Sequence, residues 1–353
     1  MKTNKFICLV LLAGLFIFLF PTHSMAESEN LGYSVQAILN GKQIDPTKSY
    51  FYVQTTPGEE QELTVIVKST QVEPVNVKVY VEDAFTGNKG TVEYTTDKKL
   101  LDKTLSDPMS SILKVETPSM TVEKAEAKEA KFTLTPPKEH YAGVKMGTLV
   151  FELDDSDDNS TMASQFAYRI GILTSESGED YENAQTLNLL DAKSLLLRGK
   201  KMILTTLQNP EPKVLSKLAI TAELKNKKNQ KVIKTEKVEN YALAPNSKFD
   251  FEMDWGTSDI EAGTYVLSLV AKNTHGDWSF EKEFIITGDQ AKSMNEESGF
   301  KIITPLWIKV TTIVCLVFMV GATGVLLLRR KKMETEWERR RKRKKRKKKK
   351  EGK

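Results

Sequence analysis

Two long apolar stretches enclose a body in which apolar and polar residues alternate. Residues 6–20 form an unbroken apolar run, and residues 310–328 contain no charge. In residues 63–68 and 75–82 every second residue is apolar, which is the period of a half-buried strand. Further predicted strands are 33–39, 49–54, 119–123, 130–135, 146–153 and 164–174. No long helical pattern occurs between the two apolar stretches, so the body is predicted to be all-β.

Turn residues divide this body into short strands and then into two modules. Pro57-Gly58 and Glu73-Pro74 separate successive runs, and turns every 8 to 12 residues are typical of a β-sandwich. A second series follows, with predicted strands at 184–190, 200–208, 214–225, 230–239, 247–255, 263–272 and 276–287. The pattern predicts two tandem immunoglobulin-like β-sandwich domains, at 27–175 and 181–288, and a polar stalk at 289–305.

The N-terminal stretch has the organisation of a secretory signal peptide. Lys2 and Lys5 precede the apolar run, and small residues follow it at Ser24 and Ala26. The run is shorter than the roughly 20 residues needed to cross a bilayer. We predict a signal peptide at 1–26, cleaved between Ala26 and Glu27.

The C-terminal stretch is long enough to span a membrane. The predicted transmembrane helix, residues 306–328, is followed at once by basic residues. Basic residues stay on the cytoplasmic side of a span. The sequence therefore predicts a single-pass cell-membrane protein with its N-terminal region outside and a cytoplasmic polybasic tail at 329–353. The residues expected at the inner membrane surface are Arg329, Arg330, Lys331 and Lys332.

The net charge of +5 conceals an acidic body and a basic tail. Residues 329–353 hold 17 Lys or Arg and four Glu, whereas residues 27–328 carry a net charge of −10. A dense basic run binds polyanions without specificity. Beside a membrane it meets anionic lipid first, so we expect lipid contact and no nucleic-acid function.

Cysteine usage points to a bacterial surface. Cys8 and Cys315 lie in the two apolar stretches, so the exported body has none. Animal ectodomains are commonly stabilised by disulfides, whereas domains of this size can rely on core burial alone. With the basic tail, this favours the cell surface of a Gram-positive bacterium.

The residues needed for familiar catalysis are scarce. His140 and His275 are the only histidines of the body and fall in different modules, so a catalytic triad or histidine-rich metal site is not expected. No nucleotide-binding glycine loop is present. A carboxylate pair for glycoside hydrolysis stays open, because only the separation of two carboxylates is informative. We predict no enzyme activity and no cofactor.

An acidic run and a tyrosine pair are the remaining candidates for binding. Asp154 and Asp158 have part of the spacing of a calcium loop, but the usual Gly and Glu positions hold Asn159 and Gln165. A solvated hairpin loop is favoured over weak calcium binding. Tyr50 and Tyr52 are candidate ligand contacts, although alternate aromatics in a sandwich strand also serve as core.

Several ordered motifs resemble the WxL-interacting proteins of Gram-positive bacteria. The opening YSVQAILNGKQIDPTKSYFY, the stretch TPPKEHYAGVKMGTLVFE and FAYRIGIL are similar to that family's first module. LQNPEPKVLSKL, APNSKFDF, AGTYVL and WSFEKEFII resemble its second. The likeness covers essentially the whole chain. It departs at Asn40, where the family often has Pro, and at Met146-Gly147, where it often has Gly-Gly.

The resemblance implies a membrane-anchored, adhesive surface protein. It implies a peptidoglycan-binding first module, a second module for host or extracellular-matrix proteins, and association with WxL-domain proteins. No catalytic residue comes with it. A signalling receptor that acts through its basic tail is the alternative.

The acidic body would not favour anionic wall polymers by charge alone. We therefore expect WxL-domain capture at an exposed strand edge. Residues 27–300 should keep this binding, and a proline in the docking edge should abolish it.

Overall fold

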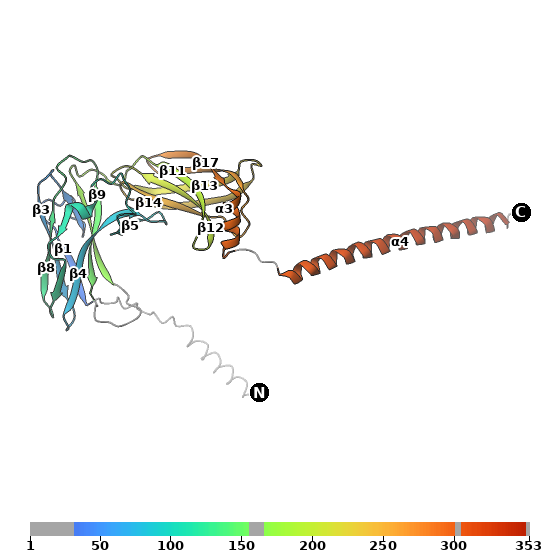
Figure 1. The fold of residues 1–353 in the computed structure, drawn as a ribbon, viewed down its shortest axis with the longest axis horizontal. Helices are drawn as coiled ribbons and strands as arrows, with labels where there is room; N and C mark the ends of the chain where they lie inside the picture. The colour runs from blue at the N-terminus through green and yellow to red at the C-terminus, as the bar shows by residue number, and fades with distance from the viewer. Residues whose placement is uncertain (1–31, 155–165, 301–304, 351–353) are drawn as a thin grey trace, which may run out of the picture. The chain divides into compact units, whose positions relative to one another are not determined.

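The computed structural model describes residues 32–154, 166–300 and 305–350, which Figure 1 colours along the chain. The predicted signal peptide, with Ala26 and Glu27, lies outside the described residues. Within them the chain is mainly β-strands, with an apolar helix near its C-terminus. The predicted fold class, all-β with one C-terminal apolar helix, is confirmed.

The first sandwich consists of two sheets. One has the strand order β1-β3-β8-β6, and the other the order β2-β10-β9-β4-β5 with β7 paired to β4. The bounds are β1 Tyr33–Ile38, β2 Phe51–Gln54, β3 Gln61–Ser69, β4 Val75–Thr86, β5 Val92–Thr95, β6 Leu113–Val115, β7 Ser119–Val122, β8 Ala127–Leu134, β9 Lys145–Leu153 and β10 Ala167–Ser175. A short helix, α2 (Met109–Ile112), precedes β6.

The alternation in the sequence places the core of the first sandwich correctly. Leu63, Val65 and Val67 of β3 are at most 1% exposed, whereas Thr64 and Ile66 between them are half-buried. In β4 the alternation ends at the half-buried Val81, after which Glu82 and Asp83 are buried. The sequence pattern did not predict β5, β6 or α2.

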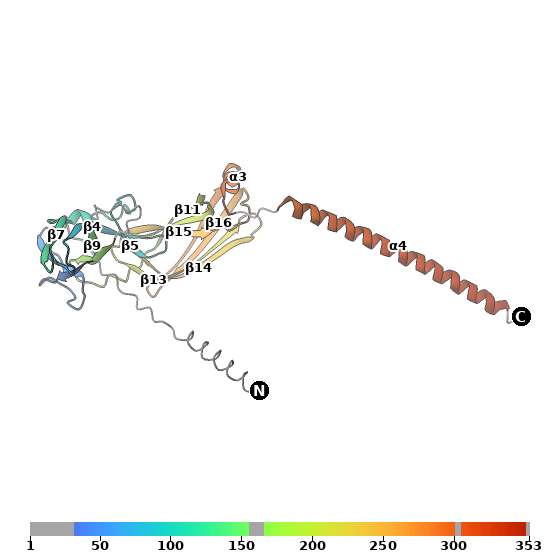
Figure 2. The same cartoon turned by 90° about the horizontal axis from the view of Figure 1, so that it is seen from below.

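The second sandwich also consists of two sheets, with strand orders β11-β12-β15 and β14-β13-β16-β17. The second sheet can be followed in Figure 2, where β13, β14 and β16 are labelled. The bounds are β11 Asn188–Leu197, β12 Lys200–Asn209, β13 Leu215–Asn226, β14 Val232–Leu243, β15 Ser247–Asp254, β16 Gly263–Lys272 and β17 Asp277–Ile286. The predicted strand 184–190 is displaced: β11 begins at Asn188 and ends at Leu197.

The core of the second sandwich comes from alternating residues of β13 and β15. Every second residue of β13 from Leu218 to Leu224 is at most 1% exposed. Trp278 and Phe280 are only half-buried and so contribute less to this core. They lie on β17, the last strand of its sheet. The Trp278 Nε1–H donates to the Gln185 carbonyl oxygen at 3.2 Å.

The predicted stalk at 289–305 needs correction, because its first part is the helix α3 (Gly288–Glu297). Thr287 and Gln290 form a capping box at its N-terminus. Ala291 and Met294 are buried, and the Asn295 side chain exchanges hydrogen bonds of 2.9 Å with the main chain of Ile260. The composition of this segment is polar, but two apolar residues three positions apart suffice to dock one helical face.

The last element, α4 (Leu306–Lys350), is one continuous helix. It contains an apolar segment that is long enough to cross a membrane and is not buried in protein. The helix continues through Arg329–Lys332 into the basic tail, where Arg330 pairs with Glu334 at 3.3 Å. The chain therefore carries a candidate membrane anchor at the predicted place.

Candidate functional site

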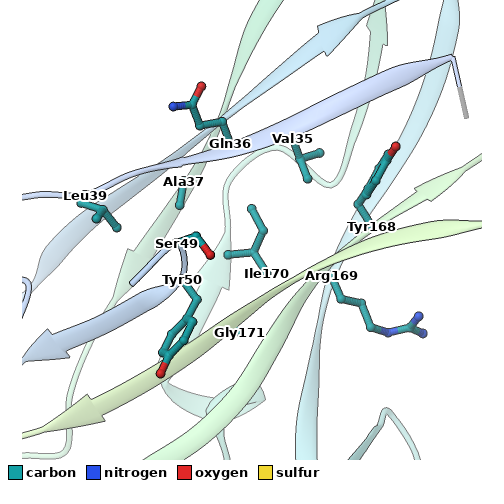
Figure 3. Close-up of a pocket in the computed structure, with 10 residues that line it drawn as sticks. All are labelled: Val35, Gln36, Ala37, Leu39, Ser49, Tyr50, Tyr168, Arg169, Ile170 and Gly171. Atoms are coloured by element: carbon teal, nitrogen blue, oxygen red, sulfur yellow. The ribbon is translucent and has the colours of Figure 1, made fainter. Parts of the chain in front are cut away.

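A cavity opens at one side of the first sandwich, between strands of its two sheets. Its volume is about 560 Å³, within the range of small-molecule and peptide pockets. Figure 3 shows its apolar floor and its tyrosines, with the Arg169 side chain directed away from the floor. The lining residues are Val35, Gln36, Ala37, Leu39, Ser49, Tyr50, Tyr168, Arg169, Ile170 and Gly171. We call this cavity and its two flanking strands, β1 and β10, the β1–β10 groove.

The floor of the groove is continuous with the hydrophobic core. Val35, Ala37 and Leu39 pack against the core but are only partly buried. On the other side, Ile170 is 7% exposed and belongs to the core itself. An apolar side chain placed here would therefore extend an existing core.

The β1 lip carries main-chain groups that no described strand pairs. The Thr70 N–H donates to the Gly32 carbonyl oxygen at 2.9 Å, and Tyr33 stands opposite Ser69. Because antiparallel pairs alternate, even-numbered residues of β1 exchange hydrogen bonds with β3 and odd-numbered residues face the other way. Val35 and Ala37 thus present their N–H and C=O groups along the groove.

At the other lip, the first half of β10 pairs with β9 but has no described neighbour on its other side. Strand β2 is short and pairs with β10 only from Ile172 onwards. The Leu153 N–H donates to the Phe166 carbonyl oxygen at 3.1 Å, so even-numbered residues of β10 face β9. Ala167 and Arg169 consequently direct their main-chain groups to the side where the described residues supply no partner strand.

Tyr33 joins the two sheets beside the groove. Its hydroxyl donates to the Phe151 carbonyl oxygen at 2.6 Å, and its ring packs edge-to-face on Tyr168 at 5.1 Å. The ring is 1% exposed, and burial raises the pKa of Tyr33 from 10.0 to about 12. This contact links β1 of one sheet to β9 of the other and so fixes the width of the groove.

The pKa of Tyr33 predicts an alkaline instability. An unfolded tyrosine ionises near pH 10, whereas folded Tyr33 keeps its proton until about pH 12. Between these values the unfolded chain binds fewer protons, so the free energy of unfolding should fall as the pH rises. Tyr33→Phe should weaken this fall and cost about 1–3 kcal/mol at pH 7, because the Phe151 carbonyl loses its donor. Urea unfolding from pH 7 to 11.5 measures the stability loss at pH 7 and the dependence of the free energy of unfolding on pH. Equal pH slopes in the wild type and Tyr33→Phe would contradict the role given to Tyr33.

The two tyrosine candidates lie in different environments. Tyr50 is half-buried in the groove, and its hydroxyl lies 3.3 Å from that of Tyr181. Tyr52 is 6% exposed, packs edge-to-face on Tyr181 at 5.5 Å and donates to the Glu179 carbonyl oxygen at 2.9 Å. Tyr52 is therefore part of a small core with Val144 and Leu173, and its burial argues against direct ligand contact.

An ion pair beside the groove joins β10 to β4. The Arg169 Nε–H donates to Glu82 Oε2 at 3.2 Å, with the Arg169 side chain 51% exposed and that of Glu82 10% exposed. Next to it, Tyr80 donates to Glu152 Oε2 at 2.7 Å. Burial and the neighbouring carboxylate raise the pKa of the Tyr80 hydroxyl. Sequence reasoning did not select these residues, because the rows they form depend on strand register.

The other predicted site residues do not line the groove, and some of them lie outside the described residues. Asp154 forms an ion pair with Lys78, whose Nζ lies 2.8 Å from Asp154 Oδ1. Asp158 lies outside the described residues. In the described part of the chain no three His, Cys, Asp or Glu side chains gather as metal ligands. Arg329, Arg330, Lys331 and Lys332 are exposed on α4.

The structure combines two β-sandwiches, an apolar C-terminal helix and a cleft lined by apolar side chains and tyrosines. The chain belongs to the WxL Interacting Protein family. Residues 33–153 match that family's peptidoglycan binding domain, and residues 157–296 match its host binding domain. The chain is thus a surface protein of a family that binds peptidoglycan and host factors. β10 falls in the second matched range but pairs with β2 and β9 of the first sandwich.

Comparison with solved structures returns proteins of low sequence identity. The CupB2 chaperone of Pseudomonas aeruginosa is 14% identical, with 66% of this chain and 96% of that chain covered and a TM-score of 0.29. The PapD-like domain of human CEP192 is 12% identical, covering 41% and 84%, with a TM-score of 0.25. At such TM-scores the likeness carries no inference about this chain. Comparison with curated proteins gives no significant match.

Proposed function

We propose that this chain is a non-catalytic, membrane-anchored protein that captures a WxL-domain protein at a Gram-positive cell surface and joins it to the wall. The β1–β10 groove is the capture site, and the captured element is an extended strand of the partner. The observation that carries this proposal is the pair of strand edges, in β1 and β10, that no described strand pairs, on either side of one cavity with an apolar floor.

An incoming strand could form main-chain hydrogen bonds and place its side chains in the cavity at the same time. Its main chain would pair with the N–H and C=O groups of both β1 and β10, and alternate side chains would enter the cavity. Apolar side chains of the size of Val or Leu suit a floor made by Val35, Ala37 and Ile170. Main-chain pairing gives affinity, and the pocket selects the side chain.

The C-terminal helix supports the anchoring part of the proposal. A span that begins at Leu306 and ends before Arg329 places the basic tail in the cytoplasm by the positive-inside rule. Both sandwiches then lie outside, where peptidoglycan and host matrix proteins are within reach. The tail contacts anionic lipid headgroups at the inner surface.

The direct test is a pull-down with purified residues 27–300 against a WxL-domain protein, wall sacculi and matrix proteins. We expect the fragment to bind the WxL-domain protein and to release no soluble product from purified wall. A fragment that binds sacculi but no WxL-domain protein would refute the capture role. Turnover of the wall would refute the non-catalytic role.

A signalling role would depend on the cytoplasmic tail, and this gives a separate prediction. When residues 333–353 are replaced by a neutral flexible sequence, with Arg329–Lys332 kept, adhesion and partner capture should be unchanged, because the groove lies in the first sandwich. Cell adhesion and co-purification of the partner measure this. Loss of a transcriptional response with capture intact would favour the receptor alternative instead.

A further inference from the structure

The hairpin that joins β13 and β14 in the second sandwich carries a dense positive charge. Residues 225–237 contain six lysines and one glutamate, although residues 27–328 as a whole are acidic. Lys227, Lys228, Lys231 and Lys237 are exposed. The tip of this hairpin is therefore positively charged, whereas residues 27–328 as a whole are negatively charged.

Part of this charge is already neutralised and part is free. Lys225 pairs with Glu223, and Lys227 pairs with Glu283 at 2.7 Å. Among the described residues, Lys228, Lys231 and Lys237 make no ion pair. Their ammonium groups remain available to an anion from outside the chain.

The turn that presents these lysines is built by its own side chains. Asn226 Oδ1 accepts from the N–H groups of Lys228 at 2.9 Å and Asn229 at 3.3 Å. Asn229 Oδ1 accepts from the Lys231 N–H at 3.0 Å, and the Gln230 side chain donates to the Lys227 carbonyl oxygen at 2.9 Å. The main chain of the tip is therefore held in one arrangement before any ligand arrives, which lowers the entropy cost of binding.

We infer that the β13–β14 hairpin tip binds an anionic polysaccharide of the host matrix, a sulfated or carboxylated glycosaminoglycan. Closely spaced lysines suit a polymer with an anionic group on each repeat, because each contact releases a counterion and the contacts act together. The acidic remainder of the body repels the same polymer and confines it to the tip. The inference rests on the host-binding assignment of residues 157–296 and supplies a ligand class for it.

The test uses the full chain in zwitterionic nanodiscs, with the basic residues 339–350 of the tail replaced by serine and glycine so that they cannot bind the probe. The probes are heparan sulfate, hyaluronan, wall teichoic acid and vesicles with anionic lipid. We expect binding to heparan sulfate or hyaluronan that weakens roughly tenfold or more between 50 and 200 mM salt. The double variant Lys228→Glu/Lys231→Glu should weaken it by at least about tenfold.

The matched control is Lys193→Glu/Lys292→Glu, which changes the net charge equally at two other exposed lysines. It should bind like the parent chain, and circular dichroism should show both variants folded. Equal losses in the two variants would mean that net charge alone matters and would overturn the inference. So would binding to teichoic acid or anionic vesicles only, or no binding to any probe. Capture of a WxL-domain protein is read out separately, so either proposal can fail alone.

Discussion

Ala37→Pro should weaken capture of the WxL-domain partner and leave residues 27–300 folded. Ala37 lies in β1, and its N–H points into the groove and away from β3. Proline removes that donor and places its ring where the incoming main chain would lie. A partner carbonyl left unpaired in a closed interface costs about 1–3 kcal/mol, so the affinity should fall by about 5- to 150-fold.

The folded state should tolerate this change. No hydrogen bond to β3 is lost, because the even-numbered residues of β1 make those bonds. The Ala37 side chain faces the cavity, which leaves room for the proline ring. Prolines are accepted at strand edges for this reason.

Val115→Pro is the matched control on the opposite edge of the same sheet. β6 is the last strand there, and the Glu116 N–H donates to the Lys131 carbonyl oxygen at 3.0 Å. The even-numbered residues of β6 therefore pair with β8, and the Val115 N–H faces away from the sheet. Isothermal titration with the partner compares the two variants. Equal affinity for Ala37→Pro and the wild type would place the capture site elsewhere.

Gly147→Ala should destabilise the first sandwich by about 1–3 kcal/mol. A Cβ added to Gly147 would lie 2.6 Å from the Met109 Cβ and 2.7 Å from the Glu82 carbonyl oxygen. Met109 is 1% exposed, and Glu82 belongs to the neighbouring strand β4. Neither contact can be relieved by turning the end of a flexible side chain, so the strands must move apart.

Gly171→Ala provides the comparison within the same pair of strands. Gly171 stands opposite Thr148 on β9, and an added Cβ would meet the Tyr50 Cβ at 3.7 Å, an ordinary contact. We expect this variant to unfold within about 0.5 kcal/mol of the wild type. Urea denaturation of residues 27–300 measures both free energies of unfolding. A loss for Gly171→Ala as large as that for Gly147→Ala would contradict the packing argument.

The period-two pattern predicted most of the fold because it reports burial directly. Leu63, Val65 and Val67 alternate in the sequence and lie in the core. The elements it did not predict are those whose stability depends on tertiary contacts. The short helix α2 is fixed by two hydrogen bonds from Ser110 to the Asp83 carboxylate, and α3 by Asn295 on Ile260.

The groove could not be predicted from the sequence, because its open edges depend on which strands pair. Val35 and Ala37 alternate like any half-buried strand. Nothing in the order of residues reveals that β2 starts at Phe51 and that no described strand pairs with Ala167 and Arg169 on that side. For Tyr50 and Tyr52, the sequence could indicate only that two aromatic residues lie on one strand. It could not tell that Tyr52 is buried and Tyr50 lines a cavity.

Hydrogen exchange at the two lips of the groove tests the central claim most directly. The amides of Val35, Ala37, Ala167 and Arg169 should exchange quickly in free residues 27–300, because they face no described strand. Saturating WxL-domain partner should slow their exchange, since strand addition gives each lip a hydrogen-bonded neighbour, while the Val115 amide should be unchanged. Partner binding with unaltered exchange at both lips would contradict capture by strand addition.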